Sequence, residues 1–253
     1  KFKTYGFEPA ETPVIEYEKI VKTGEDEVIS DIFKLKDKGK RDLALRYEFT
    51  FQLKRLAKNQ KLPYKRYQIG EVFRDEPVSS NRFRQFTQCD VDVVGSTIRD
   101  EAEILAMTSE ILKDLKINYI ININSKKLMN EILEVQKIKN KEQVIKEIDK
   151  LDKLSEAEVK GNLKKYKAEK ILEIFKKPEK FFKKYKSYKE IDEIKRYCRV
   201  CGVNVNFQPS LARGLSYYNG NIFEIKAKKG KVKETVGFLK ETIVAGGSYI
   251  INN

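Results

Sequence analysis

The sequence contains no histidine, and only three of its 253 residues are cysteine. Without an imidazole, the chain cannot form the Ser-His or Cys-His pairs that activate many nucleophiles. Cys198 and Cys201 have the spacing of half a zinc site, but no second cysteine pair completes it, so we expect reduced thiols and assign no metal to the protein. The odd, low cysteine count also argues against a disulfide framework.

Two other common patterns are missing. No apolar run approaches the ~18 residues that a membrane-spanning helix needs, and no Gly-x-x-x-x-Gly-Lys-Ser/Thr loop is present. The chain starts at Lys1 without an initiator methionine or an apolar signal segment, so we expect a cytoplasmic protein and a chain that continues beyond these residues. Its length suits one large domain, or one domain with an inserted subdomain.

Positive charge is in excess, with 52 Lys and Arg against 38 Asp and Glu. Such a surface attracts polyanions, nucleic acid first, although a lysine-rich proteome gives the same composition. Residues 126–195 hold 21 Lys and no Arg against 14 Asp and Glu, and Val144, Ile148 and Leu151 recur at helical spacing. We expect a helical insertion with a solvated surface there, and a surface that faces nucleic acid is the sharper alternative.

Hydrophobic periodicity predicts an α+β fold with an antiparallel sheet flanked by helices. A sheet-forming part precedes the helical insertion and another follows it. Strands are expected at 43–47, 66–74, 83–94, 117–123 and 215–225, and helices at 51–57 and 99–116. Thr50 is the expected N-cap of the first helix, and Thr97 with Asp100 resembles a capping box before the second.

Three segments place polar groups where a buried sheet would carry apolar ones. In the first, Glu48 and Thr50 offer a carboxylate and a hydroxyl that suit an ammonium group, although a helix cap explains them equally well. In the second, Arg74 ends one strand and Gln88, Asp90 and Asp92 share one face of the next. An arginine fork suits phosphate, whereas a cross-strand Arg–Asp pair is the simpler interpretation.

The third segment combines an arginine with phenols. Arg213 is followed by Gly214, which allows close backbone approach, and by Tyr217 and Tyr218. In isolation, a hairpin with surface aromatics is the favoured interpretation.

Taken in this order, the segments resemble one family, the histidyl-tRNA synthetases of class II. The stretch from Phe73 through Phe86 resembles class II motif 2, and its continuation 88–95 is similar to this family in particular. Residues 211–218 resemble the histidine-binding signature, 45–50 the substrate-amine segment, and 5–14 part of motif 1, the dimer element. The insertion, as in 149–154, is included in the resemblance.

The resemblance implies roles in binding histidine. Glu48 and Thr50, with Gln88, would bind its α-ammonium group. Asp92, a position that is Glu in some members, would accept a hydrogen bond from the imidazole, and Tyr217 or Tyr218 would contact the other side of the ring.

It also implies roles in binding ATP, which is expected with bound Mg²⁺. Arg74 would hold the α-phosphate, and Arg82 would reach the phosphates from the loop. Glu76 would lie near the adenine amino group, and Phe86 would stack on the base. Arg213 is the family's additional catalytic arginine, set against the histidine carboxylate and the α-phosphate.

The implied arrangement has a first catalytic part at 1–123, the lysine-rich insertion at 124–202 and a second catalytic part at 203–253. Ser216 stands where the family usually has Asp, and the resemblance ends at a glycine-rich segment, 246–249, before motif 3 and the anticodon-binding domain. The family forms homodimers and joins histidine to tRNA(His). The alternative is an inactive paralogue, a regulatory subunit of ATP phosphoribosyltransferase, but such paralogues typically lose the histidine signature.

Overall fold

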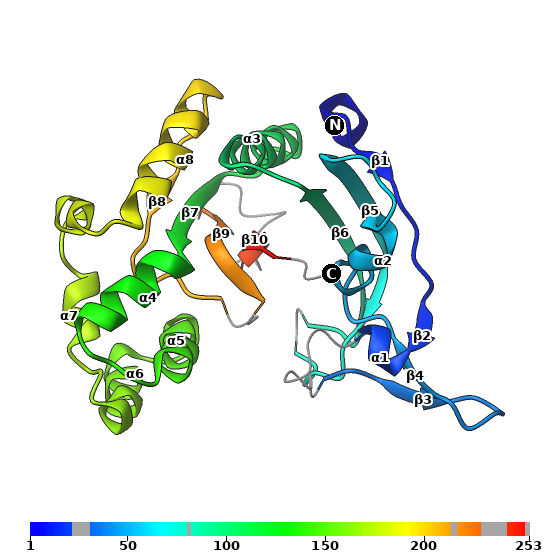
Figure 1. The fold of residues 1–253 in the computed structure, drawn as a ribbon, viewed down its shortest axis with the longest axis horizontal. Coiled ribbons are helices and arrows are strands. Elements are labelled where there is room, and N and C mark those ends of the chain that lie inside the picture. Colours follow the sequence, from blue (N-terminus) through cyan, green and yellow to red (C-terminus); the bar gives the residue numbers. More distant parts are fainter. Residues whose placement is uncertain (22–30, 80–81, 214–216, 229–241, 251–253) are drawn as a thin grey trace. The chain divides into compact units, whose positions relative to one another are not determined.

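The computed structural model describes residues 1–21, 31–79, 82–213, 217–228 and 242–250 (Figure 1). These residues form two compact units, with unit 1 spanning 1–96 and unit 2 spanning 97–250. Within the described ranges, no helix is both long enough and apolar enough to cross a membrane.

Unit 1 contains two three-stranded sheets. In the first, ordered β1-β5-β6, β1 runs parallel to β5, and β5 and β6 are antiparallel. The second, ordered β2-β4-β3, is antiparallel throughout. The elements are β1 (Glu8–Pro9), β2 (Ile15–Tyr17), β3 (Lys34–Lys36), β4 (Asp42–Leu45), β5 (Tyr64–Phe73), β6 (Gln85–Val94), α1 (Glu18–Val21), α2 (Leu53–Ala57) and the 3₁₀ helices η1 (Phe2–Tyr5) and η2 (Thr50–Gln52).

The hairpin of β5 and β6 confirms the two strands expected on either side of the polar loop. Its register places Arg66 opposite Asp92 and Gly70 opposite Gln88. The expected alternation along β6 is also correct, but Asp92 on the polar face is buried, whereas Cys89 on the other face is exposed. Burial of a charged face requires that its charges find partners within the sheet.

The partner is Arg66, whose side chain is fully buried. Its Nη2 donates to a carboxylate oxygen of Asp90 at 2.9 Å and also to one of Asp92. A buried guanidinium group with two carboxylates avoids the large cost of an unpaired charge. Burial, together with the neighbouring Asp92 carboxylate, raises the pKa of Asp90 to about 7.

The expected N-cap at Thr50 is wrong. Thr50 is the first residue of the 3₁₀ helix η2, its N-cap position is Phe49, and no side chain caps this end. The chain enters the tighter 3₁₀ turn one residue earlier than the sequence suggested, so the Thr50 hydroxyl does not occupy the capping position.

Unit 2 contains a four-stranded sheet ordered β10-β9-β7-β8, in which only β7 and β8 are parallel. Its strands are β7 (Tyr119–Ser125), β8 (Asn206–Phe207), β9 (Tyr218–Ala227) and β10 (Thr242–Tyr249). Its helices are α3 (Ile98–Asp114), α4 (Lys126–Val135), α5 (Lys141–Asp149), α6 (Glu156–Leu163), α7 (Ile171–Phe175), α8 (Tyr188–Val200), and the 3₁₀ helices η3 (Lys150–Asp152), η4 (Lys164–Tyr166) and η5 (Glu179–Lys184).

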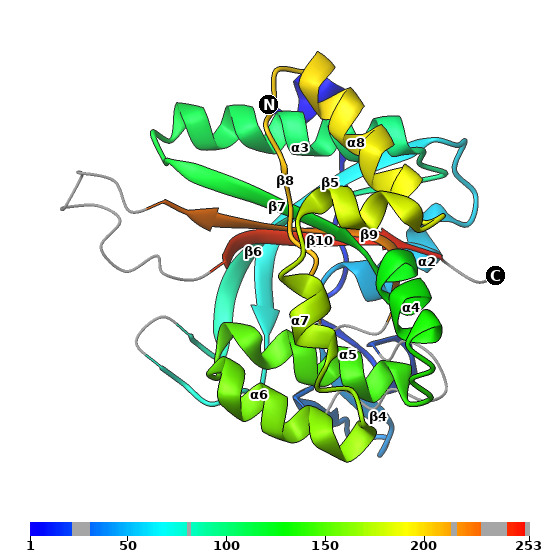
Figure 2. The same ribbon diagram turned by 90° about the vertical axis from the view of Figure 1, so that its left-hand side faces the viewer.

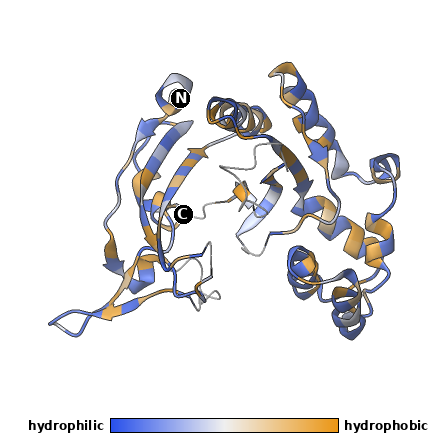
Figure 3. Ribbon diagram, turned by 180° about the vertical axis from the view of Figure 1, so that it is seen from behind, coloured by the Kyte–Doolittle hydropathy of each residue, from blue (hydrophilic) through white to orange (hydrophobic). Residues whose placement is uncertain are grey.

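The lysine-rich stretch 126–195 is helical, as expected. Its helices place apolar side chains such as Ile148, Val159 and Phe182 in one core, while their lysines face outward. The hydropathy colouring shows both characters mixed along these helices (Figure 3). The same core includes Leu105 of α3 and Ile225 of β9, so the helices and the sheet pack as one body.

The sheet of unit 2 has one apolar and one polar face. Ile121, Ile123 and Ile225 point into the helical core, and α3 and α8 lie side by side against it (Figure 2). The intervening positions carry Asn124 and Glu224, which are both buried. Successive residues of a strand face opposite sides, so these polar groups share the other face.

Helix α3 begins at the predicted capping box. Both halves of the box are present: the Thr97 side chain accepts from the backbone N–H of Asp100, and the Asp100 carboxylate accepts from the backbone N–H of Thr97. The helix ends at Asp114, before the expected residue 116. Lys116 adopts a positive φ of 56°, and the N–H of Ile117 donates to the carbonyl of Leu112. This helix ending delays β7, which starts at Tyr119 rather than 117.

The strand β9 starts at Tyr218, after residues 214–216, which lie outside the described residues. Its partner β10 contains two glycines of the glycine-rich segment at 246–249. A Cβ on Gly246 would lie 2.7 Å from the Phe223 ring, and one on Gly247 would lie 2.6 Å from the carbonyl oxygen of Asn221. Glycine is therefore required for the two strands to approach this closely.

All three cysteines are free thiols. Burial in α8 raises the pKa of Cys198 to about 12, which leaves its thiol protonated and unreactive. Among the described residues, no group of three or more Cys, Asp or Glu side chains is arranged to hold a metal ion.

We predict that Asp90→Asn flattens the pH dependence of stability. Asp90 ionises near pH 7 when folded but near its ordinary 3.8 when unfolded, so the stability contributed by its protonated form is lost as the pH rises between those values. The melting temperature of the variant should therefore fall less than that of the parent from pH 4 to pH 7. Asp75→Asn, in the exposed loop, is the matched control, and parallel curves for parent and Asp90→Asn would contradict the assignment.

Candidate functional site

The residues singled out by the sequence fall into one group in each unit. Unit 1 holds Glu48, Thr50, Arg74, Glu76, Arg82, Phe86, Gln88 and Asp92, and unit 2 holds Arg213, Tyr217 and Tyr218. Gly214 and Ser216 lie outside the described residues.

Arg74 is the centre of the group in unit 1. It follows β5 directly, and its N–H donates to the carbonyl of Arg84 across the hairpin at 2.8 Å. Its guanidinium lies over the rings of Tyr47 at 4.4 Å and Phe86 at 5.0 Å. Its Nη2 donates to Gln88 Oε1, and its Nε donates to the carbonyl of Tyr47, both at 3.3 Å. The structure thus brings Arg74, Phe86 and Gln88 together.

The loop residues Glu76 and Arg82 pair with each other at 3.2 Å. The hydroxyl of Tyr47 donates to the other oxygen of Glu76 at 3.5 Å, which joins the loop to the Arg74 group. Burial raises the pKa of Tyr47, and the charge of Arg74 opposes that shift. The phenol therefore remains a hydrogen-bond donor at neutral pH.

The segment that carries Glu48 and Thr50 is fixed by Arg46, which the sequence analysis did not single out. Buried Arg46 donates to the carbonyls of Glu71 and Thr12, each at 2.6 Å. It lies against Gly70, where an added Cβ would be 2.9 Å from Arg46 Nη2. Glu48 is buried and Thr50 half-buried in the turn that follows.

Asp92 is held by the buried Arg66, so the cross-strand Arg–Asp pair considered for this hairpin exists. The arginine is Arg66 rather than Arg74, and the sequence analysis missed it. The available signal was the register of the hairpin, which sets Arg66 directly opposite Asp92. The pair fixes the direction in which this carboxylate accepts further hydrogen bonds.

Arg213 precedes β9 in unit 2, and two polar side chains hold it. The amide of Asn124 on β7 donates to the carbonyls of Pro209 at 2.9 Å and Leu211 at 2.8 Å, which anchors the backbone before Arg213. The Arg213 Nη1 lies 3.7 Å from Glu224 Oε1. Its Nε is buried and has no hydrogen-bond acceptor among the residues that the structure describes.

Asn124 and Glu224 were also missed by the sequence analysis. Both are polar residues on strands whose other face is apolar, which is the signal that was available. The carbonyls that Asn124 binds lie 85 and 87 residues away, and Arg213 lies outside the strand that carries Glu224, so the sequence alone does not show these contacts.

Tyr217 and Tyr218 form an aromatic cluster with Tyr249. The ring centroids of Tyr217 and Tyr218 are 4.6 Å apart, and Tyr249 lies 5.4 Å from Tyr217. Tyr218 is only 7% exposed and packs with Leu211. The alternative of a hairpin with surface aromatics is therefore wrong for Tyr218.

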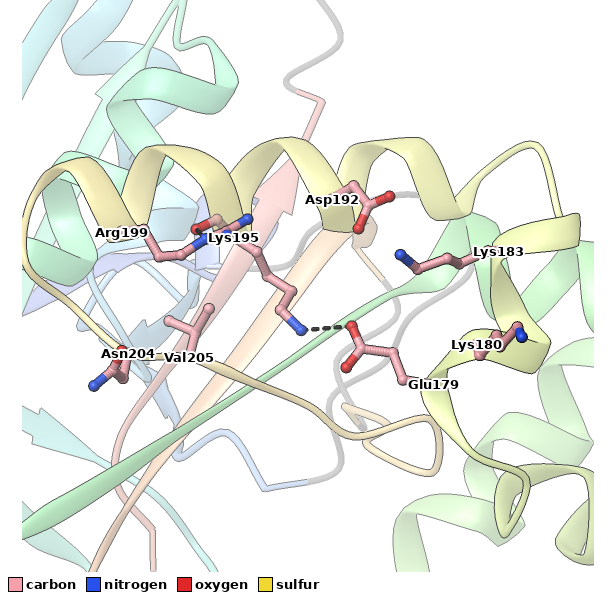
Figure 4. A pocket seen from close by; sticks show the side chains of 8 residues that line it. All are labelled: Glu179, Lys180, Lys183, Asp192, Lys195, Arg199, Asn204 and Val205. Carbon is pink, nitrogen blue, oxygen red and sulfur yellow. Dashed lines mark hydrogen bonds and ion pairs between the residues drawn. The ribbon is translucent and has the colours of Figure 1, made fainter.

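A depression of about 680 Å³ on unit 2 contains none of these residues (Figure 4). It is lined mostly by charged side chains of η5 and α8, and Lys195 Nζ lies 2.5 Å from Glu179 Oε1 within it. Its basic groups are partly neutralised by their own neighbours, as expected of a solvated helical surface.

Chemically, the two groups supply the same kind of side chain. Each presents an arginine whose position is fixed by aromatic, amide or carboxylate partners. A fixed guanidinium group can donate two parallel hydrogen bonds to a phosphate or a carboxylate.

Comparison with known proteins identifies relatives that match most of the chain. Histidine–tRNA ligase 1 from Bacillus anthracis is 34% identical over 275 residues, which cover 98% of this chain and 63% of that protein. The histidine–tRNA ligase of Helicobacter hepaticus is 40% identical over 174 residues, which cover 65% of this chain and 39% of that protein. The chain thus spans less than two thirds of the length of these relatives.

Solved structures give the same result for the fold. The histidyl-tRNA synthetase from Nostoc sp. PCC 7120 matches with a TM-score of 0.78 and 25% identity, covering 98% of this chain and 62% of that one. A Bacillus halodurans structure described as an ATP phosphoribosyltransferase regulatory subunit/histidyl-tRNA synthetase matches with a TM-score of 0.77 and 18% identity, over 98% and 69% of the two chains. At that identity, the second match concerns the fold alone.

The expected α+β fold of class II type, with antiparallel-rich sheets and flanking helices, is confirmed by these structural neighbours. The family model for histidyl-tRNA synthetase matches residues 1–252. With a match that spans the sequence and relatives at 34% identity, the chain belongs to the histidyl-tRNA synthetase family.

Proposed function

We propose that this chain is the catalytic part of a histidine–tRNA ligase, which activates L-histidine with ATP and transfers it to tRNA(His). The observation that carries the proposal is the Arg74 group, in which a guanidinium lies over two aromatic rings and is hydrogen-bonded to Gln88. Ordinary surface arginines are not fixed in this way, and a fixed fork suits an oxyanion.

In the first step, the histidine carboxylate attacks the α-phosphorus of ATP, and pyrophosphate leaves. The carboxylate is already a nucleophile, so no general base is required, in agreement with a chain that has no histidine. Negative charge builds on the phosphate oxygens, and we assign its stabilisation to Arg74 and Arg213. Arg82 would bind the outer phosphates, and Mg²⁺, arriving with ATP, would share in neutralising them.

The adenine ring would stack on Phe86, which already packs against the Arg74 guanidinium. Glu76 would accept a hydrogen bond from the adenine amino group. Tyr47 and Arg82 both contact Glu76, so its carboxylate is oriented before any nucleotide binds.

Histidine recognition is assigned to six positions. Glu48, Thr50 and Gln88 would bind the α-ammonium group, and Asp92, oriented by Arg66, would accept a hydrogen bond from the imidazole. Tyr217 or Tyr218 would contact the other ring nitrogen. A pocket that bonds both nitrogens rejects apolar analogues, because they leave its buried polar groups unpaired.

The second step passes the histidyl group to the terminal ribose of tRNA(His). Homodimerisation, a cytoplasmic location and the three-part arrangement with an insertion at 124–202 belong to the same proposal. The competing proposal, a regulatory subunit of ATP phosphoribosyltransferase, is motivated by the Bacillus halodurans fold match. Retention of Arg213 and both tyrosines favours the ligase.

We predict that the protein carrying this sequence at its full natural length catalyses histidine-dependent exchange of pyrophosphate into ATP. Arg74→Ala should lower the exchange rate by about 10²–10³-fold, because a fixed donor to the developing charge is lost. Arg84→Ala is the matched control, since Arg84 lies on the same hairpin and its side chain pairs with the half-exposed Asp75, and it should keep nearly full activity. A parent protein without exchange would reject the ligase and favour the regulatory subunit.

A second prediction concerns the imidazole. Replacing the substrate-contacting tyrosine with phenylalanine, as Tyr217→Phe or Tyr218→Phe, should raise the KM for histidine about 3- to 10-fold, the value of one hydrogen bond, and leave the KM for ATP unchanged. Tyr249→Phe removes a hydroxyl from the same aromatic cluster and should leave both constants as in the parent. If neither Tyr217→Phe nor Tyr218→Phe changes the KM for histidine, the assignment of these residues is wrong.

A further inference from the structure

Glu224 is a charged residue in the middle of a sheet, and substrate binding does not account for it. It belongs to β9, which pairs with β7 on one side and β10 on the other, and it is 3% exposed. A carboxylate in such a position is costly unless several donors surround it. The identity of those donors indicates what the carboxylate does.

Three side chains from different places converge on Glu224. Arg213 Nη1 lies 3.7 Å from Oε1, and the hydroxyl of Thr242 on β10 donates to the same oxygen. Lys226, two residues along β9, places its Nζ 3.1 Å from Oε2. Two cations therefore share one buried carboxylate, and one of them is the arginine assigned to the reacting phosphate.

The second cation extends the contacts into the lysine-rich helices. Lys226 Nζ also donates to Asp152 Oδ1 at 2.8 Å, and Asp152 ends the 3₁₀ helix η3. Asp149, at the end of α5, lies in the same neighbourhood, where burial raises its pKa and the charge of Arg213 opposes the shift. A continuous series of charges, Asp152–Lys226–Glu224–Arg213, thus connects the helical segment to the arginine.

We propose that Glu224 is a positioning residue for Arg213, and that the Lys226–Asp152 pair couples this position to the helical segment. The role rests on the proposed function, because that function assigns Arg213 to the α-phosphate. Arginine has a long, flexible side chain, and a donor that is not fixed loses much of its effect on a transition state.

The geometry explains how the position is fixed at both ends of the side chain. Asn124 holds the backbone at Pro209 and Leu211, and Glu224 engages Nη1 at the tip. The remaining donors of the guanidinium then have a defined direction. In this arrangement Asp152 acts at a distance, through Lys226, on the same guanidinium.

The kinetic test uses Glu224→Gln in the full-length protein, a change that keeps the shape and removes the charge. The turnover number for pyrophosphate exchange, per folded molecule, should fall about 10- to 100-fold, while the KM values for ATP and histidine change less than twofold. Asp152→Asn, a change at a half-exposed side chain, should give a smaller loss in the same direction. Glu173→Gln, an exposed carboxylate, is the control and should leave the turnover number unchanged.

A merely structural role would lower the melting temperature and the yield of Glu224→Gln without a lower turnover number per folded molecule, and this result would overturn the proposal. Equal changes in the KM for ATP and in turnover would also overturn it, because they indicate a lost binding contact instead of a misdirected arginine.

A second measurement tests the ion pair without any substrate. In urea unfolding, the double variant with Arg213→Gln and Glu224→Gln should shift the unfolding midpoint by less than the sum of the shifts of the two single variants. Each single change leaves the other charge buried and unpaired. Additive shifts would overturn the proposal. If the shifts are non-additive but the parent protein shows no pyrophosphate exchange, the ion pair exists and the ligase function is rejected. That result also overturns the positioning role, because the role rests on the ligase function.

Discussion

The constraint on which the structure depends is that each unit buries charge on one face of a sheet, and a buried charge needs a fixed partner. In unit 1, Arg66 is enclosed completely and holds the carboxylates of Asp90 and Asp92. The hairpin of β5 and β6 therefore has a polar face whose side chains have defined directions before any ligand binds. A catalytic arginine or carboxylate can be directed accurately only from such a surface.

The same constraint operates in unit 2 with different residues. One face of the sheet is apolar and joins the helical core, and the other presents Asn124 and Glu224 around Arg213. The two faces are formed by alternating residues of the same strands. The packing that stabilises the unit therefore also sets the position of the polar groups. The lysine-rich helices contribute to both faces, through the core on one side and through Asp152 on the other.

Much of this organisation could be predicted from local sequence. The β5–β6 hairpin, the capping box before α3 and the helical character of 126–195 each follow from patterns within a few residues. The Thr50 cap failed because a 3₁₀ turn moved the start of the helix by one residue. The register of the hairpin could have identified Arg66. The roles of Asn124 and Glu224 could not be predicted, since the carbonyls that Asn124 binds are 85 and 87 residues away and only the fold brings Arg213 to Glu224.

The central claim is that these arginines act through the fixed direction of their guanidinium fork and not through charge alone. The most direct measurement is the rate of histidine-dependent pyrophosphate exchange for Arg74→Lys, which keeps the charge but not the planar donor pair. The account predicts a loss of at least about tenfold at saturating substrates. Exchange at the parent rate would contradict it, because a point charge would then serve as well as an oriented one.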